Sequence, residues 1–216
     1  MTSELIILLW SAASIGFVHT LLGPDHYLPF IVIGKAKDWG LSRTLGLTAI
    51  CGIGHVLSSV IIGVLGILIG IQMQKLTWFE GVRGNLAAWG LIAFGLLYAI
   101  WGLRHYLKHK RKARHGHEHK SVSNATPWML FIIFFLGPCE PLIPLLMYPA
   151  AHESAMAVIL VTTIFGVVTV GTMLIAVWAA SLGLSQIRFQ KLQPLAHLLA
   201  GIIIFASGLS IQFLGL

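Results

Sequence analysis

Charged residues are scarce in this sequence. Asp, Glu, Lys and Arg make up 10% of its 216 residues, whereas a soluble globular protein carries roughly 25%. Disorder is also excluded, because disordered chains are poor in apolar residues and 57% of these residues are hydrophobic. The two cysteines, Cys51 and Cys139, are too few for a disulfide scaffold, and both lie in apolar runs. We therefore predict a single-domain, all-α membrane protein with several spanning helices.

Long apolar stretches locate the spans. A helix needs about 20 apolar residues to cross the hydrocarbon core of a bilayer. Two stretches, Thr44–Gln74 and Ser154–Ile187, contain no charged residue at all. Together with the other apolar runs they predict six transmembrane helices, at about 5–33, 44–72, 85–103, 127–150, 155–184 and 194–215.

The basic residues predict the orientation. Twelve of the 14 Lys and Arg residues lie in the loops after the first, third and fifth predicted spans. With six spans these loops share one side, which the positive-inside rule assigns to the cytoplasm, so both termini face the non-cytoplasmic side. The other two, Lys75 and Arg83, fall between predicted spans, and we expect no Arg or Lys within any span. We expect contact with the lipid bilayer and no nucleic-acid partner, and we leave open whether the chain forms a homo-oligomer.

The chain also contains an internal repeat. Leu22–His26 is similar to Leu136–Glu140 at an offset of 114 residues. Each repeat unit holds an odd number of spans, so the two units must be inverted in the membrane, as in many transporters. We predict two inverted three-helix repeats, 1–103 and 127–216, with Pro-broken helices 1 and 4 and a cytoplasmic His-rich basic loop at 104–126. Chance similarity of Gly- and Pro-rich apolar sequence is the alternative.

Ionisable side chains inside the predicted spans are the candidate functional residues, because each costs a few kcal/mol or more in lipid. They gather where prolines interrupt helices and free backbone carbonyls. Imidazole, carboxylate and thiolate together suit a divalent transition-metal ion. The candidate metal ligands are His19, Asp25, His26, His55, Cys139 and Glu140, and the candidate helix-break or gating residues are Gly23, Pro24, Gly137, Pro138 and Pro141.

Structural roles for the same residues remain open. Asp25 and His26 could pair with each other and only stabilise the bundle. His55 could form a buried hydrogen bond, and Cys51 could pack as a small hydrophobic residue.

The loop after the third predicted span is rich in histidine. His-rich tracts commonly bind metals, so this loop is a candidate for metal capture. The alternative is a solvated basic loop that touches anionic lipid head groups. Its histidines are His105, His109, His115, His117 and His119.

The stretch His19–His26 resembles the His-and-Asp-His signature of the nickel/cobalt permease superfamily, which includes hydrogenase and urease accessory permeases and nickel/cobalt efflux proteins. The six-span layout, His55 in the second span, the His-rich loop after the third span and Pro138–Cys139 in the fourth also resemble the efflux branch of this superfamily. The resemblance implies transport of Ni²⁺ or Co²⁺, and the donor set leaves Zn²⁺ as an alternative. Metal binding requires neutral histidines and ionised carboxylates and so displaces protons, which predicts proton-coupled secondary transport. We expect no prosthetic group and no enzymatic activity.

A second stretch supports an alternative function. Gly137–Pro144 resembles the Pro-Cys helix of the thiol-disulfide electron conductors of cytochrome c maturation, which also have an inverted three-plus-three layout. Those proteins place one cysteine in the first span and one in the fourth, whereas here Asp25 occupies the repeat position of Cys139. A conductor that uses Cys51 and Cys139 needs their Cα atoms to come within about 7 Å.

Overall fold

Helices account for all regular structure in the part of the chain that the computed structural model describes, residues 3–112, 125–137, 139, 141–151, 155–186 and 195–214. Five of them are long and apolar enough to cross a membrane, namely α1, α3, α4, α7 and α8. The elements, in order, are α1 (Ser3–Leu22), the 3-10 helix η1 (Pro24–His26), α2 (Leu28–Ala36), α3 (Leu41–Leu68), α4 (Met73–Lys112), α5 (Ala125–Leu136), α6 (Leu142–Ala151), α7 (Ala155–Gln186) and α8 (Ala196–Leu214). The predicted all-α membrane architecture is therefore confirmed.

The outer surface of the bundle is apolar. Large side chains such as Trp10, Leu68 and Val167 are more than half exposed, at 71%, 76% and 66%. Exposed apolar area on this scale is incompatible with water and suits hydrocarbon. The protein therefore contacts the lipid bilayer through the outer faces of its long helices.

Two apolar segments are interrupted near prolines. The segment predicted as the first span consists of α1, η1 and α2, with Pro24 opening η1. The segment predicted as the fourth consists of α5 and α6, which end and begin at Leu136 and Leu142, with Pro141 just before α6. Proline lacks an amide hydrogen and clashes with the preceding turn, so each helix ends there.

The third long helix is longer than the sequence predicts. We expect a span at 85–103, but α4 begins at Met73 and ends at Lys112. Glu80 and Arg83 therefore lie inside the helix, and both are buried. The expectation of spans without Arg or Lys is wrong. A hydropathy window penalises each charge separately, whereas this pair lies three residues apart on one helix face and is neutral as a unit.

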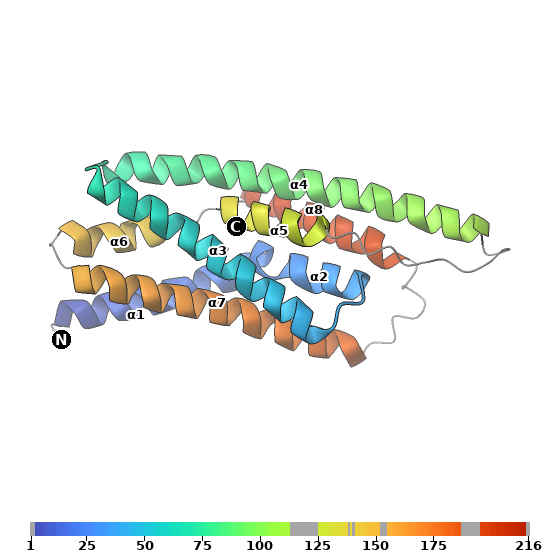
Figure 1. Cartoon of the computed structure of the whole chain (residues 1–216), viewed down its shortest axis with the longest axis horizontal. Coiled ribbons are helices and arrows are strands. Elements are labelled where there is room, and N and C mark those ends of the chain that lie inside the picture. The colour runs from blue at the N-terminus through green and yellow to red at the C-terminus, as the bar shows by residue number, and fades with distance from the viewer. Residues whose placement is uncertain are drawn as a thin grey trace.

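Helix α4 packs along α8, and α1 packs along α7. Helix α3 runs diagonally from the end of α7 to the start of α4 (Figure 1). Glycines bring α4 and α8 together, since a Cβ added at Gly102 would lie 2.6 Å from the backbone nitrogen of Leu198. The end of α2 and the start of α5 are joined by Lys37, whose Nζ donates to Thr126 Oγ1 at 2.6 Å. Burial lowers the pKa of Lys37, and the positive charge of the neighbouring Arg43 lowers it further.

The apolar interior forms two clusters. One is built around Phe30, Phe134 and Met173, and the other around Leu142 and Phe165. Polar side chains from α1, η1 and α3 form the candidate site, and one of them, His55, lies 6.4 Å from Phe134 of the first cluster between ring centroids.

Candidate functional site

Three histidines from three elements converge in the interior. His19 lies in the last turn of α1, His26 in η1 and His55 midway along α3. The ring centroids of His19 and His26 are 4.8 Å apart, those of His26 and His55 are 5.1 Å apart, and both pairs meet edge to face. One ring nitrogen from each histidine lies within 4.8 Å of the other two. His26 and His55 are only 4% and 3% exposed and are closed off from the lipid, whereas His19 is partly exposed.

Hydrogen bonds fix the orientation of two of these rings. His26 Nδ1 lies 3.2 Å from Gly23 O and 3.1 Å from Asp25 Oδ1, and His55 Nδ1 lies 3.2 Å from Phe134 O. All three partners are acceptors, so each Nδ1 carries the hydrogen and donates, which leaves the lone pair on Nε2. The Nε2 atoms of all three histidines are buried and have no hydrogen-bond partner among the described residues.

Two glycines allow the backbone to approach these rings closely. A Cβ added at Gly23 would lie 2.6 Å from His26 Nδ1 and 2.9 Å from Asp25 Oδ1. A Cβ added at Gly137 would lie 3.2 Å from His55 Nδ1. Any larger residue at position 23 would therefore displace the His26 ring from Asp25.

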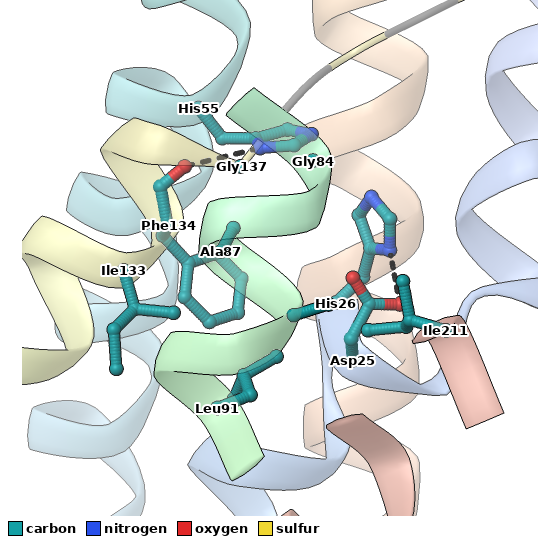
Figure 2. Close-up of a pocket in the computed structure, with 11 residues that line it drawn as sticks. Asp25, His26, His55, Gly84, Ala87, Leu91, Ile133, Phe134, Gly137 and Ile211 are labelled. Atoms are coloured by element: carbon teal, nitrogen blue, oxygen red, sulfur yellow. Dashed lines mark hydrogen bonds and ion pairs between the residues drawn. The ribbon is translucent and has the colours of Figure 1, made fainter. Parts of the chain in front are cut away.

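A small cavity adjoins the histidines (Figure 2). Its volume is about 40 Å³, which is enough for an ion or a few waters, since a single water needs roughly 10–15 Å³ on this measure. Its polar lining comes from Asp25, His26 and His55, and the remaining lining residues are Gly84, Ala87, Ala88, Leu91, Ile133, Phe134, Gly137 and Ile211. Apart from these three side chains, the cavity is lined by apolar residues and glycines.

A second polar network holds the break between α5 and α6. Arg83 Nη2 donates to Phe135 O at 2.9 Å and to Gly137 O at 3.3 Å, which are carbonyls that the end of α5 leaves without helical partners. The same Nη2 donates to Ser58 Oγ at 2.8 Å, and Nη1 donates to Glu80 Oε1. Arg83 therefore supplies the hydrogen-bond donors that these unpaired carbonyls need inside a membrane.

Cys139 lies at the other end of this network. Its backbone N–H donates to Ser59 Oγ at 3.1 Å and to Glu80 Oε2 at 3.3 Å, and Ser59 Oγ donates to Glu80 Oε2 at 3.0 Å. Glu80 and Cys139 are both 0% exposed. The positive charge of Arg83 balances the negative charge of the Glu80 carboxylate, so the buried pair has no net charge.

The two cysteines are far apart. Contacts of α5 and α6 advance steadily along α3: Phe134 meets His55, Cys139 meets Ser59, and Leu146 meets Gly63. Cys139 is thus level with Ser59, eight residues beyond Cys51, which is roughly 12 Å along the helix axis. Both cysteines are free and buried.

The structure brings together only part of the set that the sequence predicts. His19, Asp25, His26 and His55 share one site, whereas Cys139 belongs to the Glu80–Arg83 network. His105 lies apart near the end of α4, 5.8 Å from His197 between ring centroids. The predictions for Pro138, Glu140, His115, His117, His119 and the side chain of His109 fall outside the described residues.

Sequence reasoning missed Glu80 and Arg83. The signal that could have found them is an oppositely charged pair three residues apart at the start of a long apolar run. Such a pair is compatible with a membrane helix because each charge is the partner of the other.

Comparison with known proteins assigns the family. Residues 30–210, which are most of the chain, match the family described as cytochrome C biogenesis protein transmembrane region. The chain belongs to this family. The match includes both cysteines, the Glu80–Arg83 pair and His55, and it begins after His26. No curated protein and no solved structure matches the chain. Membership and the five apolar helices together make the chain an integral membrane protein.

The family corrects the functional prediction. It is a family of thiol-disulfide conductors, so the assignment to the nickel/cobalt permeases and the prediction of nickel or cobalt transport are wrong. Its signature stretch, His19–His26, lies outside the matched residues, whereas His55, the His-rich loop and Pro138–Cys139, which also support it, lie inside them and are compatible with both families. Any helix break inside a membrane needs polar side chains to satisfy its backbone, so His and Asp at such a break are a weak signature of one family.

Proposed function

We propose that the protein carries reducing equivalents across the membrane by thiol-disulfide exchange in cytochrome c biogenesis. The observation that carries this proposal is the family match over residues 30–210, which includes Cys51 and Cys139. The resemblance of Gly137–Pro144 to the Pro-Cys helix of thiol-disulfide conductors also supports it.

The chemistry needs two thiols. Oxidation of Cys51 and Cys139 to one disulfide releases two electrons and two protons, and these reduce one disulfide of a partner to a dithiol. A dithiol on the other side of the membrane then reduces the cysteine pair again and becomes a disulfide itself. Each cycle therefore transfers two electrons, and the protein returns to its starting state.

The separation of the thiols makes motion part of the mechanism. A disulfide requires Cα atoms within about 7 Å, and the two cysteines lie roughly 12 Å apart along α3. We propose that α3 moves relative to the break between α5 and α6 during each cycle. Glu80 and Arg83 act as positioning residues, because they hold the backbone of Cys139 where the helix is interrupted.

Two inverted repeats would provide this motion. With the offset of 114 residues, α1 corresponds to α5, α2 to α6, α3 to α7 and α4 to α8. Packing supports the correspondence, because α1 against α7 matches α3 against α5, and α2 against α8 matches α4 against α6. Figure 1 also shows α3 running opposite to α7, and α4 running opposite to α8, as inversion requires. Rocking of one repeat against the other is a common mechanism in such proteins.

The basic residues support an orientation for these repeats. The loop between α2 and α3 and the ends of α4 and α7 lie at one end of the bundle (Figure 1). The segment from Lys35 to Arg43 and the last turns of α4, from Arg104 to Lys112, hold eight of the Lys and Arg residues that the positive-inside rule places in the cytoplasm. We propose that this end is cytoplasmic and that both termini face the other side.

Purified protein in vesicles provides the test. A membrane-impermeant dithiol peptide is added outside, and the reduction of a disulfide-quenched fluorescent peptide is followed inside. We expect reduction with the wild type, and only the rate of empty vesicles with Cys51→Ser, Cys139→Ser or the double variant, since one remaining thiol cannot close the cycle. Ser210→Ala, at an exposed position on α8, is the control and should keep the full rate. A double cysteine variant with the wild-type rate would refute the proposal.

A further inference from the structure

We propose that His19, His26 and His55 form a binding site for one resident transition-metal ion of the copper and zinc class. This inference goes beyond the proposed function, because none of the three ligands is a thiol and the site does not include Cys51 or Cys139. It concerns an ion that stays bound, and not a transported one.

The geometry needs only small shifts to bind an ion. Three atoms within 4.8 Å of one another have a common centre about 2.8 Å or less from each, and zinc–imidazole bonds are about 2.0–2.1 Å long. Each nitrogen would therefore move by about 0.8 Å or less. Rotation of a histidine ring about its side-chain bonds covers that distance without moving a helix.

The buried nitrogen atoms favour an occupant. Leaving a buried polar atom without a partner costs about 1–3 kcal/mol, and the Nε2 atoms of all three histidines are buried without one. A single metal ion would satisfy three such atoms at once. Chance placement of three unpartnered imidazole nitrogens around one point, from α1, η1 and α3, is hard to explain by packing alone.

The surrounding groups prepare these rings as ligands. Metal-binding histidines almost always donate their second ring N–H to a carboxylate or a backbone carbonyl, which fixes the tautomer and the ring orientation. His26 has both kinds of partner, Asp25 and Gly23 O, and His55 has Phe134 O. Figure 2 shows the Asp25 carboxylate beside the His26 ring and the Phe134 carbonyl beside the His55 ring. Asp25 thus orients the His26 ring through this hydrogen bond.

The donor set indicates the class of metal. Three neutral imidazoles suit copper and zinc, whereas magnesium and calcium prefer oxygen ligands. The cavity of about 40 Å³ that His26 and His55 line leaves space for a water or another small ligand in a fourth position. A site with three protein ligands and one open position is the arrangement that reactive metal sites use.

Elemental analysis of the full-length protein tests the site. The protein is purified without a histidine tag, with the loop histidines His105, His109, His115, His117 and His119 changed to Ser, so that the loop binds no metal. Of these five histidines, His105 and His109 lie in α4 and the other three follow it in the chain. The protein is then incubated with an excess of Zn²⁺ or Cu²⁺ and separated from free ions by gel filtration. We expect one ion per chain, and X-ray absorption should show a first shell with imidazole nitrogen at about 2.0 Å and no sulfur.

Asparagine substitutions separate binding from folding. In His26→Asn and His55→Asn the amide nitrogen can replace Nδ1 as the donor, while the metal-binding Nε2 is removed. Each should lower metal affinity at least tenfold, and Asp25→Asn should lower it by about 10- to 100-fold through the loss of its support for His26. His197→Asn, at a histidine on α8 outside the cluster, is the matched control and should bind like the wild type.

Several results would overturn this inference. They are the absence of stoichiometric metal in folded protein, a sulfur ligand in the absorption spectrum, and full retention of metal by the double variant His26→Asn/His55→Asn. Cys139→Ser should keep its metal while it loses thiol exchange. A failure of the metal site and a failure of the proposed conduction are therefore distinguishable.

Discussion

Arg83 shows how a single side chain can make a helix break tolerable inside a membrane. Its guanidinium group donates to two carbonyls at the end of α5 and to the buried Glu80, whose carboxylate accepts from the backbone of Cys139. The two charges neutralise each other, and their remaining hydrogen-bonding groups meet Ser58 and Ser59. The conformation of the peptide around Cys139 therefore depends on a residue more than fifty positions earlier in the chain.

Removal of Arg83 should destabilise the protein strongly. Arg83→Met leaves the Glu80 carboxylate buried without its partner, so we expect a loss of about 3–5 kcal/mol in the free energy of unfolding. Glu80→Gln/Arg83→Met should lose less than the single Arg83→Met variant, because no unpaired charge remains. Chemical unfolding of the protein in detergent micelles measures both, with the exposed Arg104→Met as the control. Equal losses in the single and double variants would contradict the role of Arg83 as a partner of a buried charge.

The two interrupted helices solve the same problem in different ways. At the first break the freed Gly23 carbonyl accepts from the neighbouring residue His26, so the break is stabilised within its own segment. At the second break the Gly137 carbonyl accepts from Arg83 on a different helix, α4. The first break can therefore form locally, whereas the second requires α4 to be packed in place. Its proposed motion is thus linked to the packing of α4 against α8.

Close packing of α4 on α8 should not tolerate a single added methyl group. A Cβ at Gly102 would lie 2.6 Å from the backbone nitrogen of Leu198, and one at Gly201 would overlap the backbone of Ala99. We expect Gly102→Ala and Gly201→Ala each to cost about 1–3 kcal/mol of unfolding free energy, since the helices must separate.

Gly81→Ala is the matched control for that prediction. It lies on the same helix as Gly102, and an added Cβ would contact nothing within 4 Å. It should be neutral or gain up to about 1 kcal/mol, because Ala favours a helix more than Gly does. Similar unfolding energies for Gly81→Ala and Gly102→Ala would show that the two helices are not in close contact.

At the scale of the whole molecule, charge and polarity are distributed along one axis. The basic ends of the helices lie at one end of the bundle, the outer faces are apolar, and the histidine cluster and Cys139 are buried within. This distribution would hold the protein in one orientation, because moving the basic end through the bilayer would cost several kcal/mol for each charge.

Reporter fusions test that orientation. Alkaline phosphatase, which is active only outside the cytoplasm, should be active at both termini and inactive when inserted between the end of α4 at Lys112 and the start of α5 at Ala125. Green fluorescent protein should give the opposite pattern at the same positions. Termini that report opposite sides would exclude an even number of spans and, with it, the proposed pair of inverted three-helix repeats.

The sequence by itself determined the properties that single residues and their near neighbours control. Apolar runs specified membrane helices, and prolines marked where two segments are interrupted, since both effects are local to the chain. The sequence resembles two families, and the resemblance to the nickel/cobalt permeases is wrong. Its signature is eight residues at a helix break, and its other features, the span layout, His55, the His-rich loop and Pro138–Cys139, are not specific to one family.

Only the tertiary structure decided which of these residues meet. It separated Cys51 from Cys139, joined His55 of α3 to His19 and His26, and buried Glu80 with Arg83 inside α4. These relationships depend on how helices distant in the sequence pack, through glycine contacts and hydrogen bonds to carbonyls that a break exposes. Hydropathy and spacing along one helix hold no information about the residues of another.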